Sequence, residues 1–430
     1  MIRFVYNLLM PLAFLFFIPG LLLKYRNRGG WKSTFPERFG RFSADRRREL
    51  EAFHGAIWIH AVSVGETVIA LNLVRALLKR RPATKIVIST TTTTGQELAR
   101  QKCPENATVI FCPIDFLWMV KRAFDVIRPA MLVIFETEIW PNLICEGKRR
   151  GIPLVLANGR MSDHSVRGYR KLKCFFGPLL AKFDRLLVQS DADAERYREV
   201  SPEAHVAVCG NMKFDQEIPE NPGDPGLDAC FGAAPRTVLL GASTHAGEEE
   251  LLIHTFIELK PEFPDLKIVL VPRHAERGAD IAAMLDAHNL PYVRRSASKS
   301  AAKPVDVLLA DTTGEMMMFM NAADVVVMGK SLAGHDEGHN LIEPALLGKP
   351  IVTGAVLRNF RFLLQVLEQN DAVAAVASDG ELTGVLRRLL ADPRARADLG
   401  SRAKNAIGLH RGATGRTVDA IESLLGDHSA

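Results

Sequence analysis

The sequence predicts an α/β protein of two domains, each with a parallel β-sheet covered by helices on both faces. Short runs of β-branched and aliphatic residues alternate with amphipathic helical patterns, as strands buried on both faces require. The alternation stops at segment 216–228, which is rich in Pro, Gly and acidic residues, and then restarts. A chain of 430 residues also exceeds what one hydrophobic core usually holds.

Twelve apolar runs predict the strands, and the segments between them are long enough for helices. Ligands of such sheets bind at the carboxyl ends of the strands, so we expect a site in a cleft between the two domains. The predicted strands of the first domain are 56–62, 85–90, 108–114, 131–136, 152–158, 185–190 and 205–210. Those of the second are 237–243, 267–272, 306–311, 324–329 and 350–354.

The chain begins with an uncharged apolar run, 4–23, which is long enough to cross a bilayer as a helix. We predict a single membrane-anchor helix with a basic flank over 1–30. The domains then follow at 31–220 and 221–430. A cleaved signal peptide is disfavoured, because no A-x-A site follows the run and the basic flank opposes export. Insertion into one leaflet only stays open beside a spanning helix.

The net charge of +5 is concentrated at one end of the chain. The first 48 residues contain ten Lys and Arg but two acids, which gives +8 there and −3 for the rest. The positive-inside rule therefore predicts that the chain from Lys24 onward stays on the cytoplasmic side of the membrane, with the basic segment on anionic headgroups. A nucleic-acid partner is not expected, because the basic segment directly adjoins the apolar run.

The composition excludes several classes of protein. With 47% apolar and 24% charged residues the chain is globular, and its six cysteines form no C-x-x-C pair. No Walker loop and no G-x-G-x-x-G after the first strand occur. His335, Asp336 and His339 do not have a recognisable metal-ligand spacing. We therefore expect neither a cofactor nor a metal.

Charged residues follow three strands of the first domain. Glu66 ends H-A-V-S-V-G-E and suits either a general base or an acid that stabilises a helix start. Glu136 and Glu138 are two apart after the fourth strand, where two like charges would raise a pKa or bind a cation or sugar hydroxyls. Lys213 in G-N-M-K-F-D suits an anion, although a lone Lys is usually solvated.

The second domain carries a polar motif after each of several strands. Arg273 in V-P-R-H-A-E-R suits a phosphate or carboxylate, and the helix start in D-T-T-G-E-M offers free N–H groups to a phosphate. Glu343, after the turn G-H-N, can accept hydrogen bonds from ribose hydroxyls. The residues of S-T-H-A-G-E-E also fit plain helix capping.

These motifs, in this order, resemble those of the Kdo transferases of lipid A biosynthesis, which are glycosyltransferases of GT-B architecture. The resemblance covers almost the whole chain. It implies an inverting transfer of Kdo from CMP-Kdo to the acceptor lipid IVA. It assigns the general base to Glu66 and transition-state stabilisation to Glu136 and Lys213. It assigns the CMP contacts to Pro272, Arg273, Thr313, Gly314, Glu315, Asn340, Leu341, Ile342 and Glu343.

The sequence departs from the family pattern in places and leaves alternatives open. The family often has two glycines where this chain has Gly329 and Lys330, which could alter the surroundings of the phosphate. Another membrane-associated GT-B transferase that uses a different nucleotide sugar is the second interpretation. A tethered binding module without catalysis is the third. The number of Kdo units added does not follow from the sequence.

Overall fold

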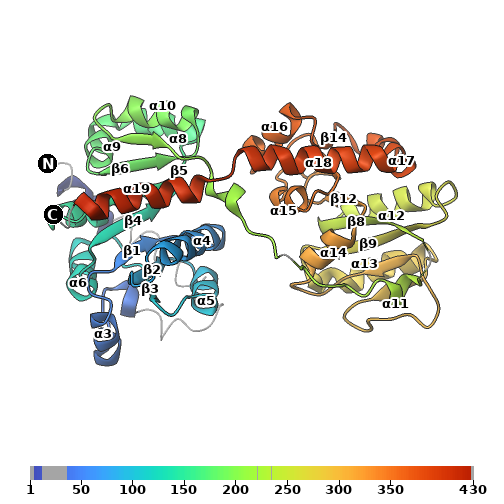
Figure 1. The fold of residues 1–430 in the computed structure, drawn as a ribbon, viewed down its shortest axis with the longest axis horizontal. Helices are drawn as coiled ribbons and strands as arrows, with labels where there is room; N and C mark the ends of the chain where they lie inside the picture. The colour runs from blue at the N-terminus through green and yellow to red at the C-terminus, as the bar shows by residue number, and fades with distance from the viewer. Residues whose placement is uncertain (1–3, 12–35, 220, 234, 428–430) are drawn as a thin grey trace. The chain divides into compact units, whose positions relative to one another are not determined.

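The computed structural model describes residues 4–11, 36–219, 221–233 and 235–427, and it divides into two compact units (Figure 1). Unit 1 comprises Met1–Asp215 together with Arg411–Ala430, and unit 2 comprises Gln216–His410. The sequence predicted the first domain to end at residue 220 and assigned all of 221–430 to the second. The structure differs because the last helix returns to unit 1.

Unit 1 contains a seven-stranded sheet in the order β3-β2-β1-β4-β5-β6-β7, with every neighbouring pair parallel. All seven strands predicted for this domain are present. The strands are β1 (Ile57–His60), β2 (Ile86–Thr90), β3 (Ala107–Phe111), β4 (Met131–Phe135), β5 (Leu154–Gly159), β6 (Arg185–Val188) and β7 (Val206–Val208). The helices are α3 (Ala44–Glu51), α4 (Val64–Arg80), α5 (Thr93–Gln101), α6 (Leu117–Ile127), α7 (Pro141–Arg149), α8 (Asp163–Lys171), α9 (Lys173–Leu180), α10 (Asp191–Val200), η1 (Met212–Asp215) and α19 (Ala413–Asp427).

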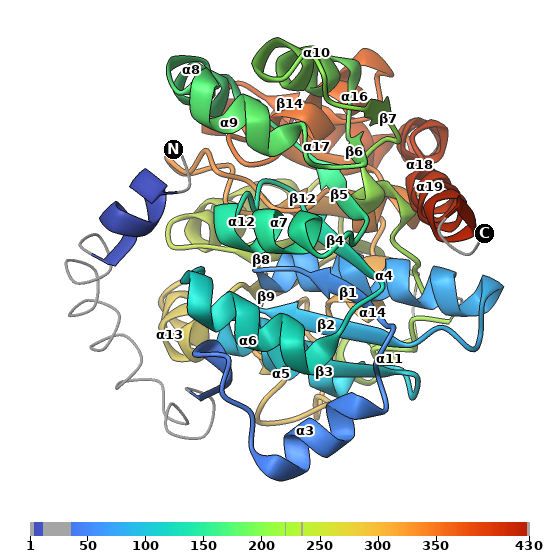
Figure 2. The same cartoon turned by 90° about the vertical axis from the view of Figure 1, so that its left-hand side faces the viewer.

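Helices cover both faces of the unit 1 sheet. Successive residues of a strand point to opposite faces, so each strand contributes side chains to two apolar clusters. In β1, Trp58 packs edge-on against Phe124 of α6, with ring centroids 5.0 Å apart. Its neighbours Ile57 and Ile59 belong to the cluster on the other face, where α4 and α19 pack. Figure 2 shows α6 and α7 on one side of these strands and α4 and α19 on the other.

Helix α19 belongs to unit 1 because it completes the second of these apolar clusters. Val418, Ile421 and Leu424 are buried in it. The Asp215 carboxylate accepts hydrogen bonds from the backbone N–H groups of Gly412 (2.6 Å) and Thr414 (2.5 Å), which holds the start of the helix. The sequence pattern shows that this helix is amphipathic, but only the tertiary structure shows which sheet its apolar face covers.

Unit 2 contains a second seven-stranded parallel sheet, in the order β10-β11-β9-β8-β12-β13-β14. The five predicted strands are present. The strands are β8 (Thr237–Thr244), β9 (Leu266–Pro272), β10 (Tyr292–Arg294), β11 (Val307–Leu309), β12 (Val325–Met328), β13 (Ile351–Gly354) and β14 (Ala374–Val376). The helices are α11 (Asp228–Phe231), α12 (Glu248–Leu259), η2 (Ala275–Arg277), α13 (Gly278–Ala287), α14 (Met316–Ala322), α15 (Ile342–Leu346), α16 (Arg361–Gln369), η3 (Asp379–Glu381), α17 (Leu382–Ala391) and α18 (Pro393–Leu409).

The sequence prediction missed the two edge strands, β10 and β14. Each has three residues and is only partly buried. An edge strand is covered less than a central one, so its residues need not form the continuous apolar run on which the prediction relied. Segment 216–228 is irregular over its described residues up to 226, as a linker should be, and α11 begins at its end.

The predicted anchor lies largely outside the described residues. Residues 4–11 are helical and contact unit 1, where the Tyr6 hydroxyl donates to Asp115 (2.9 Å) and Asn7 exchanges hydrogen bonds with Asn142 (3.1 and 2.8 Å). In the part of the chain that the structure describes, no helix combines the length and apolarity that crossing a bilayer requires.

The packing of α19 yields a first prediction. Replacing Ile421 by Ala removes a fully buried side chain and should destabilise unit 1 by about 2–4 kcal/mol. In a unit of this size, that corresponds to a melting temperature lower by about 5–10 °C in differential scanning calorimetry. Ser423→Ala, at an exposed position of the same helix, is the matched control and should change little. Equal effects of the two variants would contradict the assignment of α19 to the core.

Candidate active site

Glu66 lies in the first turn of α4, where the chain leaves β1. Ser63 caps this helix, and its Oγ accepts a hydrogen bond from the Glu66 N–H (3.3 Å). The Glu66 carboxylate accepts from the Val62 N–H (2.7 Å) and from the Ser63 hydroxyl (2.9 Å). This reciprocal capping box fixes the position of the carboxylate. The capping role considered from the sequence is therefore present, and it is compatible with a chemical role.

The surroundings of Glu66 shift its carboxyl toward the neutral form. Burial is the main cause that raises the pKa of this carboxyl, and the negative charge of Glu136 adds to it. The hydrogen bonds from Val62 and Ser63 and the positive charge of Lys213 act in the opposite direction. A carboxylate with a raised pKa accepts a proton more readily, as a general base must.

Glu136 and Lys213 form an ion pair at the same sheet edge. Lys213 Nζ lies 3.3 Å from Glu136 Oε1, and both side chains are partly exposed. Glu136 directly follows β4 with a φ of 54°, and its N–H donates to Ala157 O (3.0 Å). Lys213 is in η1, which Asn158 holds by accepting from the Met212 N–H (2.9 Å). The structure therefore brings the two predicted stabilisers together and places both near the charge of Glu66.

Glu138 is a fourth member of this group, which the sequence prediction did not include among the site residues. Burial raises its pKa to about 7, with further contributions from the charges of Glu66 and Glu136. The Trp140 indole N–H donates to its Oε2 (2.8 Å) and opposes this shift. A carboxyl with this pKa exchanges protons at neutral pH. Its spacing from Glu136 was a usable signal, since the sequence analysis expected adjacent acids to raise a pKa.

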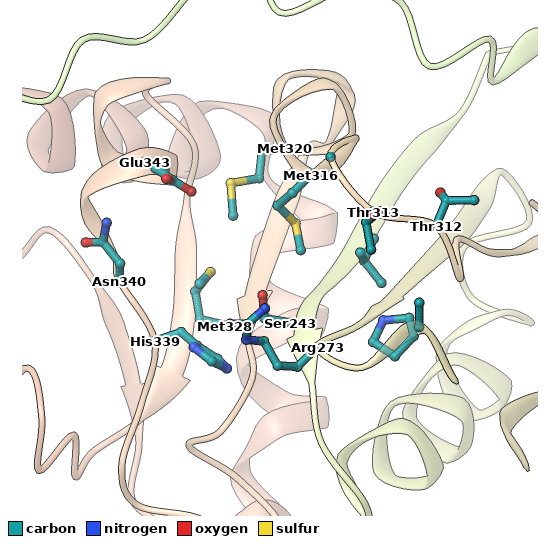
Figure 3. A pocket seen from close by; sticks show the side chains of 14 residues that line it. Ser243, Arg273, Thr312, Thr313, Met316, Met320, Met328, His339, Asn340 and Glu343 are labelled. Carbon is teal, nitrogen blue, oxygen red and sulfur yellow. The ribbon is translucent and has the colours of Figure 1, made fainter. Parts of the chain in front are cut away.

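A cavity of about 400 Å³ lies in unit 2, at the carboxyl ends of β8, β9 and β12 (Figure 3). Six of the predicted donor-binding residues line it, which are Pro272, Arg273, Thr313, Gly314, Asn340 and Glu343. The other lining residues are Ser243, Val271, Ala275, Thr312, Met316, Met320, Met328 and His339. The motifs of this domain therefore converge on one cavity, as their positions after successive strands predicted.

Three of the predicted donor contacts do not line this cavity. The Glu315 carboxylate pairs with the Arg295 guanidinium (2.7 Å) and accepts a hydrogen bond from the Thr312 hydroxyl, so it fixes the turn before α14. Leu341 and Ile342 are buried in the core of unit 2. These three side chains are therefore engaged in the interior of unit 2 rather than available to a ligand in this cavity.

Arg273 provides an uncompensated positive charge at the cavity. It directly follows β9, and its backbone N–H donates to Thr244 O (3.0 Å). Within the described residues its guanidinium makes no hydrogen bond or ion pair to the protein, and the side chain is exposed. A guanidinium in this state is available for two parallel hydrogen bonds to a phosphate or carboxylate.

Gln216 contacts two residues that line the cavity, although the sequence analysis treated it as part of the linker. Its Nε2 donates to Glu343 Oε1 (2.9 Å), and its Oε1 accepts from Asn340 Nδ2 at 3.4 Å. It thereby orients two of the predicted donor contacts. No sequence signal marks this residue, because a polar side chain at the start of an irregular segment has no periodic pattern.

One buried carboxylate holds the loop that follows β12. Glu248 accepts hydrogen bonds from the N–H groups of His245 (2.8 Å), Lys330 (2.8 Å), Ser331 (2.9 Å) and Leu332 (2.9 Å). The loop also requires glycine at 329, because a Cβ there would lie 2.4 Å from the carbonyl oxygen of Ser243. The sequence analysis interpreted this acid as a helix cap, which accounts for only the first of its four bonds.

Across the described ranges, no group of three or more His, Cys, Asp and Glu side chains is placed so that it could hold a metal ion.

The raised pKa of Glu138 predicts a pH-dependent stability. Between pH 4.5 and about 7 the folded protein retains this proton more tightly than the unfolded chain does. Ionisation therefore destabilises the native state as the pH rises through this window. Glu138→Gln, which cannot ionise, should raise the melting temperature relative to wild type at pH 8 but hardly at pH 5. Glu195→Gln, at an exposed position, is the control, and a difference that does not grow with pH would contradict the prediction.

Solved structures with the same fold have different sequences. The UDP-GlcNAc 2-epimerase from Neisseria meningitidis is 12% identical, with a TM-score of 0.57 over 86% of this chain and 100% of that one. A glycotransferase of kitacinnamycin is 16% identical, with a TM-score of 0.53 over 86% and 99%. At these identities the likeness shows the fold alone, which is a GT-B-like pair of α/β units.

Comparisons of the sequence identify the family, which the structural neighbours do not. A family model described as 3-deoxy-D-manno-octulosonic-acid transferase (kdotransferase) matches residues 33–216. The 3-deoxy-D-manno-octulosonic acid transferase of Bordetella pertussis is 35% identical over 413 residues, which cover 93% of this chain and 94% of that protein. That of Haemophilus influenzae is 31% identical over 376 residues, or 86% and 87% of the two chains. The chain belongs to the Kdo transferase family of glycosyltransferases.

Proposed function

We propose that this protein is an inverting glycosyltransferase that moves Kdo from CMP-Kdo to lipid IVA in lipopolysaccharide biosynthesis. The observation that carries this proposal is the cavity of unit 2, which gathers Arg273, Asn340 and Glu343 in a chain of the Kdo transferase family. These side chains offer a phosphate contact and ribose contacts in one place.

The proposed donor contacts follow from the chemistry of CMP. Its single phosphate requires less charge compensation than a diphosphate, and the guanidinium of Arg273 can supply it together with the backbone at Thr313 and Gly314. The Glu343 carboxylate, oriented by Gln216, can accept hydrogen bonds from the ribose hydroxyls. We therefore propose that donor binding and departure of CMP need no metal ion.

Glu66 of unit 1 is the proposed general base. Its carboxylate takes the proton from the acceptor hydroxyl while that oxygen bonds to the anomeric carbon of Kdo. The bond from this carbon to the phosphate oxygen breaks on the opposite face, and CMP leaves with the electron pair, so the configuration inverts. The capping box holds the carboxylate in place, and burial makes it a stronger base than an exposed glutamate.

Lys213 and Glu136 are the proposed stabilisers of the transition state. The ammonium group of Lys213 can offset negative charge that develops during transfer, and Glu136 holds it at 3.3 Å. Their ion pair also limits the repulsion between Glu136 and an anionic donor. Glu138 is suited to receive a proton from this region, because it exchanges protons near neutral pH.

We further propose that the protein acts at the cytoplasmic face of the inner membrane. The uncharged run 4–23 and the basic residues after it support this location. In the described helix 4–11, Phe4, Leu8 and Leu9 are more than half exposed, while Tyr6 and Asn7 bond to unit 1. This arrangement leaves an apolar surface for lipid beside the domain that carries Glu66. A phosphorylated lipid acceptor would be found at the same surface.

The test of the proposal is a transfer assay with CMP-Kdo and lipid IVA, analysed by mass spectrometry. Glu66→Gln should lower the turnover number by about 10²–10⁴-fold, the usual contribution of a general base. It should bind CMP as wild type does, because the CMP contacts belong to unit 2. Glu97→Gln, at an exposed position in unit 1, is the control for charge removal. Turnover of Glu66→Gln within twofold of wild type would exclude Glu66 as the base.

A transferase that uses a uridine diphosphate sugar is the alternative, and the fold allows it because a solved neighbour binds UDP-GlcNAc. One described guanidinium at the cavity suits one phosphate better than two. Isothermal titration calorimetry should therefore show at least tenfold tighter binding of CMP than of UDP. Tighter binding of UDP would favour the alternative.

A further inference from the structure

Four histidines meet beside the donor cavity, and the proposed mechanism uses none of them. They come from three loops at the carboxyl edge of the unit 2 sheet. The ring of His245 lies 5.8 Å from that of His274, 5.5 Å from that of His335 and 5.3 Å from that of His339. His339 also lines the cavity next to Arg273 (Figure 3). We call these four residues the histidine cluster.

Two members of the cluster share one hydrogen bond. His245 Nε2 and His339 Nε2 are 3.2 Å apart, so one ring donates and the other accepts. The third ring, His335, bonds through Nε2 to the carbonyl oxygen of Ala246 (3.0 Å). The fourth, His274, lies 3.6 Å from Glu276, and both of these side chains are more than half exposed. Among the described residues, no carboxylate is hydrogen-bonded to the imidazole ring of His245 or His339, although Glu248 accepts from the backbone N–H of His245.

Cations surround the central pair. The pKa of His339 is lowered to about 4, mainly by burial and then by the neighbouring His245, Arg273 and Lys330, while a hydrogen bond with the Ser243 backbone opposes the shift. The nearby acids are already engaged, since Glu248 accepts four backbone N–H groups and Glu249 pairs with Arg277 (2.6 and 3.1 Å). Glu337 lies 3.8 Å from Lys330 at the rim. The charges of Arg273 and Lys330 disfavour a further positive charge on the pair, so they would stabilise an anion there.

Lys330 contributes this charge at a conformational cost. Its φ is 62°, in the left-handed region that glycine adopts freely and that side chains with a Cβ disfavour. The backbone is held there by the hydrogen bond from its N–H to Glu248 (2.8 Å). Strain of this kind is retained where the side chain has a use. The use that fits the surroundings is the positive charge next to the histidine cluster.

We propose that the histidine cluster and Lys330 form a subsite for the carboxylate of the donor sugar, next to the phosphate contact of Arg273. This inference rests on the proposed function. In CMP-Kdo the carboxylate and the phosphate are attached to the same anomeric carbon, so the two anionic groups are adjacent. A donor with two neighbouring anions needs two neighbouring cationic contacts, and the structure supplies them. The subsite would select an acidic sugar over a neutral one.

The test compares two ligands that differ by the acidic sugar. Calorimetry without acceptor gives dissociation constants for CMP-Kdo and for CMP. Lys330→Gly and His245→Asn should each weaken CMP-Kdo binding by at least about fivefold, the range of one charge-assisted contact. Both should leave CMP binding within twofold of wild type. Lys330→Gly should also keep or raise the melting temperature, because glycine relaxes the backbone there. Lys303→Gly, which removes an exposed charge of the same unit, is the control.

Three results would overturn the inference. One is wild-type protein that binds CMP-Kdo no more tightly than CMP. Another is that the variants weaken the binding of CMP-Kdo and of CMP equally, which would indicate that the cluster contacts the phosphate. The third is variants that weaken neither. Failure of the proposed function has a different signature, since CMP-Kdo would still bind through the cluster but no Kdo would reach lipid IVA. Steady-state kinetics should agree, with a raised KM for CMP-Kdo and an unchanged kcat.

Discussion

A single buried carboxylate, that of Glu248, organises the edge of the unit 2 sheet where the donor cavity forms. It accepts four backbone N–H groups from two loops that are far apart in the sequence. Hydrogen bonds to a buried carboxylate are strong. Removing this carboxylate would leave the four backbone N–H groups without an acceptor. The loop after β12 is therefore held in one conformation, and with it His339 and Asn340 at the cavity. The requirement for glycine at 329 follows from the same close approach.

Unit 1 uses a related device for its own charged site. There the capping box of α4 orders the Glu66 carboxylate, and neighbouring loops bring Glu136, Glu138 and Lys213 to the same edge. Parallel sheets place all strand carboxyl ends on one side, so loops far apart in sequence meet there. In both units a helix start supplies rigidity and a polar side chain supplies chemistry. In unit 1, Glu66 both fixes the start of its helix and carries the proposed chemistry. In unit 2, Glu248 fixes the loop and Arg273 provides the charge for the ligand.

The central strands of both sheets and the polar motifs at their ends could be predicted from the sequence, because both have local sequence signals. A strand buried on both faces must be a continuous apolar run, and the polar residue after it is easily seen. Edge strands such as β10 and β14 are less constrained and were missed. Glu315, Leu341 and Ile342 fit the family motif, but their side chains face Arg295 or the core. Gln216, in contrast, belongs to no motif but still contacts the site, because its side chain donates a hydrogen bond to Glu343.

The sequence by itself determined the α/β class, the two sheets, the family and the residue types that carry charge at the strand ends. These follow from periodicity and from motifs that are contiguous in the chain. The tertiary structure decided which sheet α19 completes, which motif side chains reach the cavity, and that four histidines meet beside Lys330. Those facts depend on contacts between distant segments. Such contacts are selected by shape and burial, for which a single sequence has no local signature.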